Sequence, residues 1–366
     1  MNQLGGKVLL PFRYRKKEIV LKALFLAGGM GTRLRPLTDH LPKPMVPVMG
    51  IPLLERSIDE LKRCGVNEVI LSTCYESDCI SQHFSTGEKS QMKIHCICEK
   101  EPLGTGGAIK NCQKYFDDTF LIFNSDILCN IDLKALVQFH REKHSDVTIA
   151  AAEVKNPSSY GVIEHMPDGK ILSFTEKPKP GEEKSHDINA GIYVFEPRVL
   201  DMIPAGKSVS VERDTFPLLL KNGFRMNVYR IGGYWIDIGT PEKYMKAHKD
   251  IFNGACTVHE NDFRSAKVYG ADNADIASSA KITGPVWLGK NIHIGENAVI
   301  GPNAVLGDGF QAGQGCEVRN SVIWNGVTLG NGVNIDHSVV TSDCSLASGI
   351  CCENTIYSSD SKLPFA

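Results

Sequence analysis

The chain has 366 residues, with 40 Lys and Arg against 42 Asp and Glu, which gives a formal net charge of −2. This length accommodates two domains with separate cores, and the near-neutral charge excludes the basic surface typical of nucleic-acid-binding proteins. The apolar runs are too short for a membrane-spanning helix. The twelve cysteines show no C-x-x-C pair and no zinc spacing, so we expect reduced thiols and a cytoplasmic protein.

The first 21 residues form a basic N-terminal extension. Their apolar stretch, residues 8–11, is too short for the hydrophobic region of a signal peptide. The segment also lies wholly before the first predicted strand. We therefore interpret residues 1–21 as a disordered tail or as residues upstream of the natural start.

From residue 22 to about residue 253, strand-like and helix-like segments alternate. This alternation predicts an α/β fold in which helices cover a parallel sheet and the ligand binds at the carboxyl ends of the strands. Asp132 is a suitable N-cap and Pro52 suits a first helical turn. The predicted strands are 23–26, 67–73, 92–98, 119–123 and 147–153, and the predicted helices are 52–64, 106–116 and 133–143.

A glycine-rich segment directly follows the first strand. Gly28, Gly29 and Gly31 allow backbone N–H groups to approach phosphate oxygens or the edge of a base. Arg33 adds a fork of donors suited to phosphate, and Lys43, between two prolines, adds a point charge. The spacing matches neither a P-loop nor G-x-G-x-x-G.

The segment 26–44, LAGGMGTRLRPLTDHLPKP, resembles the signature GGxGTRLxPLTxxxPKP of the sugar-1-phosphate nucleotidylyltransferases. This resemblance implies a Rossmann-like domain with a mixed central sheet. It also implies that Arg33 and Lys43 hold the triphosphate as catalytic residues. The other residues of the segment that would contact the nucleotide are Leu26, Ala27, Gly28, Gly29, Gly31 and Thr32.

Asp126 follows an apolar strand in the sequence Asn-Ser-Asp. It could be a turn cap, or a carboxylate ligand of Mg²⁺, a hard cation that needs oxygen ligands beside transferring phosphates. The resemblance implies the second reading, with Asp237 of Tyr-Trp-Ile-Asp as the other metal ligand. The sequence separation of the two aspartates does not itself predict this pairing.

The sugar phosphate would contact three further motifs. Glu176 and Lys177 resemble the family's EKP motif, in which the glutamate binds sugar hydroxyls and the lysine binds the sugar phosphate. A Glu-Lys pair is otherwise an ordinary surface pair. Asn189, in Asn-Ala-Gly, would reach a sugar hydroxyl, and the backbone of Gly161 would touch the sugar.

The segment 99–107, EKEPLGTGG, would read the base, with Gly104 and Thr105 giving close backbone approach. A carboxylate only accepts hydrogen bonds, so Glu99 matches the N1–H and N2–H₂ donors of guanine. A glutamine would suit uracil or thymine better. The alternative is that Glu99 is an exposed loop residue.

The segment 208–217 resembles the S-[IV]-E-x-[DE]-x-F-P stretch of mannose-1-phosphate guanylyltransferases. Its Glu212 could touch substrate or stabilise a helix start. His140 and His144 lie four residues apart, but among charged neighbours, which favours a solvated helix face over a metal site. His293 and His337 are expected to be surface residues.

After Cys256, aliphatic residues recur every six positions, with one five-residue step between Val318 and Ile323. A period of six predicts a parallel β-helix, and the resemblance is to the left-handed β-helix with hexapeptide repeats. The run supports about four coils, which we assign to residues 257–357 with an assembly or regulatory role. We expect a modest interface with the catalytic domain, 22–253. The repeated positions are Ile276, Ile282, Leu288, Ile294, Ile300, Leu306, Ala312, Val318, Ile323, Leu329 and Ile335.

The sequence thus predicts a Mg²⁺-dependent enzyme that joins GTP and mannose 1-phosphate to give GDP-mannose and pyrophosphate. It would be a homo-oligomer assembled through the β-helix, without nucleic-acid or membrane partners. Three alternatives remain open: another nucleotide or sugar, such as glucose 1-phosphate or a heptose 1-phosphate; a non-catalytic regulatory subunit; and an acyltransferase activity in the β-helix.

Overall fold

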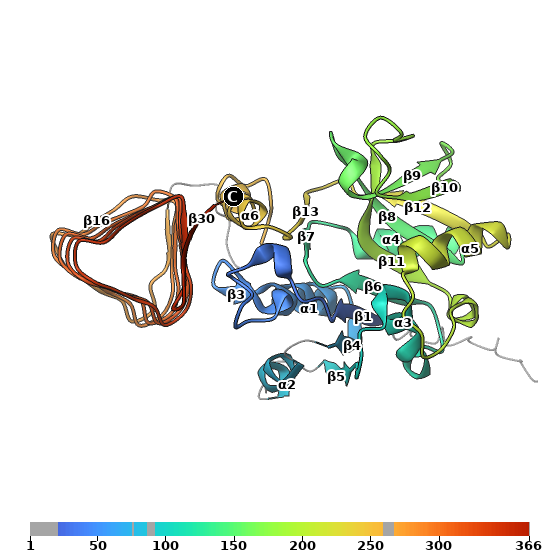
Figure 1. Ribbon diagram of the computed structural model, residues 1–366, viewed down its shortest axis with the longest axis horizontal. Helices are drawn as coiled ribbons and strands as arrows, with labels where there is room; N and C mark the ends of the chain where they lie inside the picture. Colours follow the sequence, from blue (N-terminus) through green and yellow to red (C-terminus); the bar gives the residue numbers. More distant parts are fainter. Residues whose placement is uncertain (1–20, 75–76, 86–91, 259–266, 366) are drawn as a thin grey trace, which may run out of the picture.

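The computed structural model describes residues 21–74, 77–85, 92–258 and 267–365 (Figure 1). The predicted N-terminal extension lies outside the described residues, apart from Leu21, which belongs to the first strand. None of the helices in this part of the chain has the length and apolar character needed to span a membrane.

A nine-stranded mixed sheet organises the first region of the described chain, with the path β10-β9-β11-β6-β1-β4-β5, while β8 pairs with β11 and β12. β1 pairs in parallel with β4 and β6, whereas β11 is antiparallel to β6 and β8. The predicted Rossmann-like domain with a mixed sheet is confirmed. The strands are β1 (Leu21–Ala27), β4 (Val66–Thr73), β5 (Lys93–Cys98), β6 (Phe120–Asn124), β8 (Val147–Glu153), β9 (Gly161–His165), β10 (Ile171–Glu176), β11 (Asp187–Phe195) and β12 (Met226–Arg230).

Two short ribbons stand apart from this sheet: β2 (Pro47–Val48) pairs with β3 (Ile51–Pro52), and β7 (Ile127–Cys129) pairs with β13 (Trp235–Asp237). The β7–β13 ribbon is antiparallel. It links two segments of chain that are more than a hundred residues apart.

The three predicted helices are present and differ from the structure only near their ends, whereas three further helices were not predicted. Asp132 caps α4, its carboxylate accepting from the N–H of Ala135 at 2.9 Å. Pro52 precedes α1 instead of lying in its first turn. The predicted helix 106–116 ends earlier, because a 3₁₀ turn follows α3. The helices are α1 (Leu53–Arg63), α2 (Ser77–Ser85), α3 (Gly104–Asn111), α4 (Leu133–Glu142), α5 (Phe216–Lys221) and α6 (Pro241–Phe252). The short turns are η1 (Thr32–Leu34), η2 (Lys43–Met45), η3 (Gln113–Tyr115), η4 (Pro157–Ser159), η5 (Pro197–Met202) and the π-helical η6 (Val211–Thr215).

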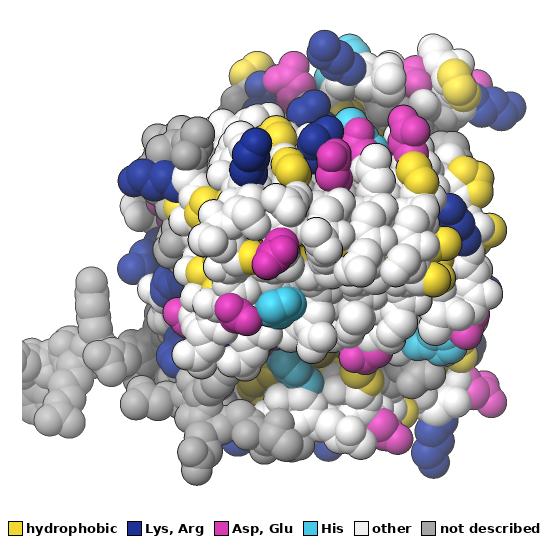
Figure 2. Space-filling model, turned by 90° about the vertical axis from the view of Figure 1, so that its left-hand side faces the viewer, with side chains coloured by type: hydrophobic (Ala, Val, Ile, Leu, Met, Phe, Trp, Pro, Cys, Tyr) yellow, Lys and Arg dark blue, Asp and Glu magenta, His cyan; other side chains and the backbone are white. Residues whose placement is uncertain are grey.

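The C-terminal strands form the three flat faces of a triangular prism (Figure 1). Strands from successive turns pair in parallel, as in a left-handed β-helix. Of the predicted repeat positions, Leu288 to Ile335 are buried, whereas Ile276 in the first coil is 36% exposed. Figure 2 shows the side of the β-helix that is turned away from α6. Hydrophobic side chains and charges of either sign are scattered there among uncharged groups.

The β-helix has five three-stranded coils within the described residues, more than the predicted four. After Ile335 a second five-residue step leads to Val340, and Leu346 and Cys352 continue the buried series. The strands are β14 (Val268–Gly270), β15 (Asp275–Ile276), β16 (Lys281–Ile282), β17 (Val286–Leu288), β18 (His293–Ile294), β19 (Val299–Ile300), β20 (Ala304–Leu306), β21 (Gln311–Ala312), β22 (Glu317–Arg319), β23 (Val322–Ile323), β24 (Thr328–Leu329), β25 (Asn334–Asp336), β26 (Val339–Val340), β27 (Ser345–Leu346), β28 (Cys351–Glu353), β29 (Thr355–Tyr357) and β30 (Lys362–Pro364).

α6 lies between the sheet region and the β-helix (Figure 1). One apolar cluster runs through all three, and it contains Leu34, Val48, Tyr244, Trp324 and Val339, all buried. The hydroxyl of Tyr244 accepts from Trp324 Nε1 at 2.9 Å and donates to the carbonyl of Pro47 at 2.6 Å. The two regions therefore meet through this shared cluster, to which the β-helix contributes apolar side chains, and the expected modest size of their interface stays a prediction.

Candidate active site

The β7–β13 ribbon brings Asp126 and Asp237 to the same place. Asp237 pairs with Ile127, the residue after Asp126, and the N–H of Ile238 donates to the carbonyl of Asp126 at 2.8 Å. Asp126 also follows β6, so the ribbon sits at the carboxyl end of a central strand. The backbone pairing thus supplies the link between the two aspartates that sequence separation does not predict.

Both aspartates line a cavity of about 170 Å³. Its wall combines both charge signs with amide and aromatic groups, as a site for a phosphorylated sugar requires. Seven predicted site residues line it: Arg33, Asp126, Gly161, Glu176, Lys177, Asn189 and Asp237. The residues that the sequence analysis did not assign to a site, or left open, include Asn124, Tyr160, Glu212, Trp235 and Lys243.

The glycine-rich loop approaches this cavity through Lys43. Gly31 has a φ of +63°, and a side chain there would meet the stem of Lys43 at 3.0 Å and Thr38 at 3.1 Å. The ammonium of Lys43 contacts the Asp126 carboxylate. Lys43 does not itself line the cavity, so it reaches the site through Asp126.

Arg33, on η1, lies near Asp237. A Cβ atom on Gly239 would lie 3.5 Å from the Arg33 guanidinium and 3.0 Å from the Asp237 carboxylate. The Arg33 guanidinium and the Asp237 carboxylate thus both lie next to the backbone of Gly239. Leu26, Ala27, Gly28, Gly29 and Thr32 lie along the end of β1 and the loop, outside this cavity.

Glu176, Lys177, Asn189 and Gly161 form the opposite wall. A Cβ on Gly161 would lie 2.8 Å from a Glu176 oxygen, so glycine keeps this wall open. The Asn189 amide donates to the hydroxyl of Tyr193 at 2.9 Å and accepts from the N–H of Gly191 at 2.9 Å. Burial, together with the nearby charge of Glu212, raises the pKa of Glu176.

Lys243 is the cation that the sequence analysis missed. Its ammonium contacts the Asp237 carboxylate and donates to the hydroxyl of Tyr160 at 2.8 Å, and Tyr160 in turn donates to Asp237 at 3.0 Å. Burial lowers the pKa of Lys243, but its bonds to Asp237 and Tyr160 outweigh this and the pKa is raised. The signal was present, because Thr240-Pro241 predicts a helix start that returns residue 243 toward residue 237.

Asn124, at the end of β6, also lines the cavity. Its Oδ1 is buried and accepts no hydrogen bond among the described residues. A buried amide oxygen of this kind is stabilised by a donor from a ligand, such as a hydroxyl. No motif singled out this residue.

Glu99 lies outside the cavity, beside the glycine-rich loop. It is 7% exposed, so the alternative of an exposed loop residue is wrong. Its carboxylate accepts from Ser72 Oγ at 2.8 Å and from the N–H of Leu103 at 3.0 Å. A Cβ on Gly28 would lie 3.5 Å from the same carboxylate. Each oxygen accepts one hydrogen bond in the structure, and a carboxylate oxygen can accept a second.

Gly104 and Thr105 contact the segment around Val211. A Cβ on Gly104 would lie 2.6 Å from the carbonyl of Val209, and the Thr105 hydroxyl donates to Glu212 at 2.7 Å while accepting from the N–H of Val211. These contacts give both residues a packing role. They also hold the Glu212 carboxylate at the rim of the cavity.

The donor set fits a divalent cation. Mg²⁺ is commonly held by one or two carboxylates together with substrate phosphates, and Asp126 and Asp237 supply two carboxylates on one cavity. No group of three or more metal-ligating side chains exists among the described residues. The site therefore suits a cation that shares its ligands with a substrate.

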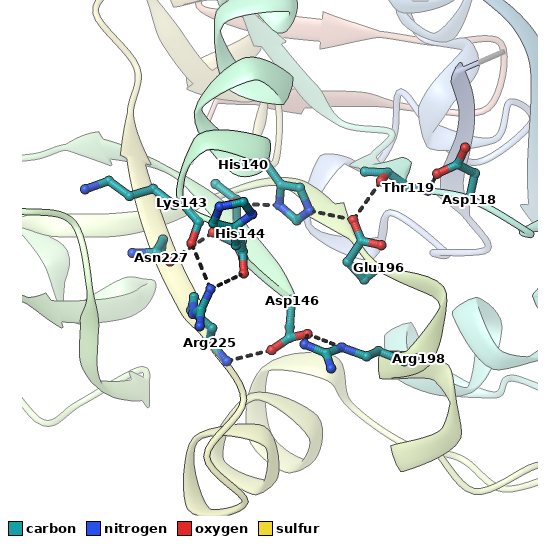
Figure 3. Close-up of polar contacts among 12 residues, drawn as sticks. Asp118, Thr119, His140, Lys143, His144, Asp146, Glu196, Arg198, Arg225 and Asn227 are labelled. Carbon is teal, nitrogen blue, oxygen red and sulfur yellow. Dashed lines mark hydrogen bonds and ion pairs between the residues drawn. The ribbon is translucent and has the colours of Figure 1, made fainter. Parts of the chain in front are cut away.

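His140 is not on a solvated helix face (Figure 3). It is 1% exposed, and its ring bonds to Thr148 at 2.8 Å and to Glu196 at 3.1 Å. Burial lowers the pKa of His140. The prediction was wrong because one face of α4 packs on the sheet, whereas His144, beyond the helix, is exposed. None of the twelve cysteines, all of which lie within the described residues, forms a disulfide bond.

Two family models match the chain. The model described as "Nucleotidyl transferase" matches residues 22–254, and the one described as "GMPPB C-terminal domain" matches residues 267–363. The first covers more than half of the chain.

Individual proteins match mainly the first region. A mannose-1-phosphate guanylyltransferase from Mycobacterium tuberculosis is 40% identical over 63% of this chain and 65% of its own length. A UTP–glucose-1-phosphate uridylyltransferase from Synechocystis is 33% identical over 74% of each chain. The chain thus matches about two thirds of the length of these relatives. The crystal structure of HddC from Yersinia pseudotuberculosis, complexed with GMP-PN, is 36% identical with a TM-score of 0.54, covering 62% of this chain and 97% of that one.

Proposed function

Because this chain belongs to the nucleotidyl transferase family, we propose that it joins a nucleoside triphosphate to a sugar 1-phosphate, giving an NDP-sugar and pyrophosphate. The observation that carries this proposal is the cavity in which two aspartates face Arg33, Glu176 and Lys177. Carboxylates for a cation, cations for phosphate and amides for hydroxyls meet there within one small volume.

The reaction requires alignment more than a strong base. The phosphate oxygen of the sugar is already ionised, and it attacks the α-phosphorus while pyrophosphate leaves. Lys177 would orient the attacking phosphate. Arg33 and Lys43 would hold the triphosphate, with Arg33 stabilising the charge that develops on pyrophosphate.

Asp126 and Asp237 would hold Mg²⁺. When bound there, the ion would screen the negative charges of the two substrates. Glu176 and Asn189 would bind sugar hydroxyls, and the buried Oδ1 of Asn124 offers one more acceptor. The backbone of Gly161, which has no side chain, would let the sugar approach the wall.

The nucleotide that we propose is GTP and the sugar is mannose 1-phosphate. Glu99 supports guanine, because Ser72 and Leu103 orient its carboxylate beside Gly28 and both oxygens can still accept. Gly104 and Thr105 would complete this base site. The likeness to guanylyltransferases and to a structure complexed with GMP-PN supports the same base.

A second substrate pair also has support. The relative named UTP–glucose-1-phosphate uridylyltransferase matches a larger share of this chain than the mycobacterial protein does. Glucose 1-phosphate with UTP, or a heptose 1-phosphate with GTP, is therefore the alternative. Sugar hydroxyl stereochemistry is read by loop placement, which residue identity does not fix.

The deciding experiment is a matrix of four nucleoside triphosphates against mannose, glucose and heptose 1-phosphates, measured by pyrophosphate release. We expect the highest kcat/KM for GTP with mannose 1-phosphate. Release from no pair would support a regulatory subunit instead, and preference for UTP would support the second pair. Asp126→Asn protein, folded but lacking one proposed metal ligand, serves as the background control.

We further propose that residues 22–253 are the catalytic unit and that residues 257–357 form a β-helix unit through which copies assemble. Light scattering would test the assembly. Cysteines without disulfide bonds suit the reducing cytoplasm, where we place the enzyme.

A further inference from the structure

The proposed metal ligands are each held by a lysine. Lys43 contacts the Asp126 carboxylate, and Lys243 contacts the Asp237 carboxylate. The two pairs differ in position, because Lys243 lines the cavity and Lys43 does not. Of these two lysines, the one that lines the cavity therefore lies outside the family motifs described above, and it joins Arg33 and Lys177 there.

Lys243 is held by a compact set of contacts. Besides Asp237, its ammonium bonds to the Tyr160 hydroxyl at 2.8 Å and lies 5.1 Å from the centre of the Tyr160 ring. An ammonium has three donors, and the two hydrogen bonds use two of them. The Thr240 hydroxyl accepts from the N–H of Lys243 at 3.4 Å, which fixes its backbone in the first turn of α6.

Lys243 and Tyr160 both bond to Oδ1 of Asp237. A divalent cation bound to the same carboxylate would lie within a few ångströms of the ammonium, and the two positive charges would repel each other. The cation and Lys243 therefore compete for Asp237. Once displaced, the ammonium still lies in the cavity that holds Glu176, Lys177 and Asn189. The group with surplus negative charge at that point is the phosphate of the sugar substrate.

We propose that Lys243 is an exchangeable counter-ion of Asp237 that becomes a second lysine ligand of the sugar phosphate when a divalent cation binds. In the empty site it neutralises Asp237 and keeps the carboxylate in place. In the loaded site it joins Lys177 on the phosphate. This role rests on the proposed function, since it requires a sugar 1-phosphate in the cavity.

The first test measures cation binding without turnover. Mn²⁺ is titrated into Lys243→Met, Lys243→Arg and wild-type protein, and free Mn²⁺ is followed by electron paramagnetic resonance. We expect Lys243→Met to bind Mn²⁺ about tenfold more tightly, the size of effect that one neighbouring cation has on proton binding by a carboxylate. Lys243→Arg keeps the competing charge and should bind Mn²⁺ like the wild type.

The matched control is Lys246→Met, one turn along α6, where the lysine pairs with Asp250 at 2.5 Å and is 61% exposed. It should leave Mn²⁺ affinity unchanged. Mn²⁺ affinity in Lys243→Met that equals or falls below that of the wild type would overturn the exchange. Circular dichroism melting of each variant confirms that it is folded.

The second test titrates mannose 1-phosphate into Mn²⁺-loaded protein by calorimetry. Losing a charge-assisted bond to phosphate should weaken binding by about tenfold or more in Lys243→Met, and Lys246→Met should not change it. Unchanged sugar-phosphate binding would refute the phosphate role. If the wild type binds no sugar 1-phosphate, the proposed function fails, whereas the Mn²⁺ titration still decides the exchange.

Discussion

Glu99 is one side chain with an observed structural task and a proposed recognition task. Buried behind the glycine-rich loop, its carboxylate satisfies Ser72 and Leu103. The Ser72 hydroxyl can rotate to accept instead of donate. An amide at position 99 can therefore satisfy both partners, so a Glu99→Gln variant should fold normally and report on base recognition alone.

We expect Glu99→Gln to lower the ratio of kcat/KM for GTP to that for UTP. The amide places a donor against a guanine donor, a mismatch that costs about 1–3 kcal/mol, or roughly 5- to 150-fold. Uracil should lose little, because its edge offers a donor beside an acceptor. Steady-state kinetics with both nucleotides measure the ratio, and Glu101→Gln, at an exposed neighbour, controls for the charge change. An unchanged ratio would remove the main structural support for guanine.

The two aspartates give a second prediction at the residue scale. Asp126→Asn and Asp237→Asn each remove charge without changing volume, and we expect turnover to fall on the order of 10²-fold or more. Calorimetric Mg²⁺ titration should show weakened binding in both. Asp201→Asn, exposed on η5, should behave as the wild type. Near wild-type rates at low Mg²⁺ in both variants would exclude the metal role.

α6 is the element that connects the site to the rest of the molecule. Its first turn carries Lys243 against Asp237, and its last turns are buried in the shared cluster. Between them, His248 accepts from the N–H of Met49 at 3.1 Å and donates to the carbonyl of Tyr244 at 2.9 Å. These bonds favour the neutral imidazole with its proton on Nδ1. A second proton, on Nε2, would point at the N–H of Met49.

Burial lowers the pKa of His248 to about 4, from an ordinary value near 6.5. Because the unfolded chain binds this proton more readily, the contribution of His248 to stability is complete above pH 6.5 and is lost as the pH falls toward 4. The shift corresponds to about 3 kcal/mol. Urea unfolding at a series of pH values should show this slope.

His248→Gln keeps an acceptor without a titrating group, so it should flatten the pH dependence between 6.5 and 4. His337→Gln, on the exposed surface of the β-helix, is the matched control and should leave the slope unchanged. An identical slope in wild type and His248→Gln would show that His248 does not titrate in this window.

At the scale of the whole molecule, the β-helix packs through the shared cluster against α6 and the 46–49 segment. Trp324 bonds to Tyr244, which bonds to Pro47, only four residues after Lys43. Removing residues 257–366 would expose the buried face of α6 and of the 46–49 segment. Truncation should therefore lower the stability of the remaining part, and not merely its assembly.

Trp324→Ala tests this coupling within the intact chain. Deleting a buried tryptophan costs about 3–5 kcal/mol. If the two regions unfold together, calorimetry should show one transition at a lower temperature, with reduced kcat because Pro47 and Lys43 lose support. Gln311→Ala, exposed on β21, should change neither quantity. A separate β-helix transition that shifts alone would show independent regions.

The order of elements could be predicted from sequence because local spacing carries it. The apolar strands, the Asp132 cap and the six-residue period from Leu288 to Ile335 depend on neighbours along the chain, and the structure confirms them. The glycine-rich signature likewise has a glycine at position 31, where the backbone is left-handed and an added Cβ would lie 3.0 Å from the Lys43 side chain. The second five-residue step, after Ile335, was also readable, but it was missed.

Tertiary structure alone decided which distant residues meet. The β7–β13 ribbon joins Asp126 to Asp237, α6 returns Lys243 to the cavity, and packing on the sheet buries His140. Trp324 reaches Tyr244 only because a flat β-helix face lies against α6. Each contact depends on the three-dimensional path of the chain between its partners. The sequence therefore determined the kind of site and its family, whereas the tertiary structure decided its charge pairs and its packing link to the β-helix.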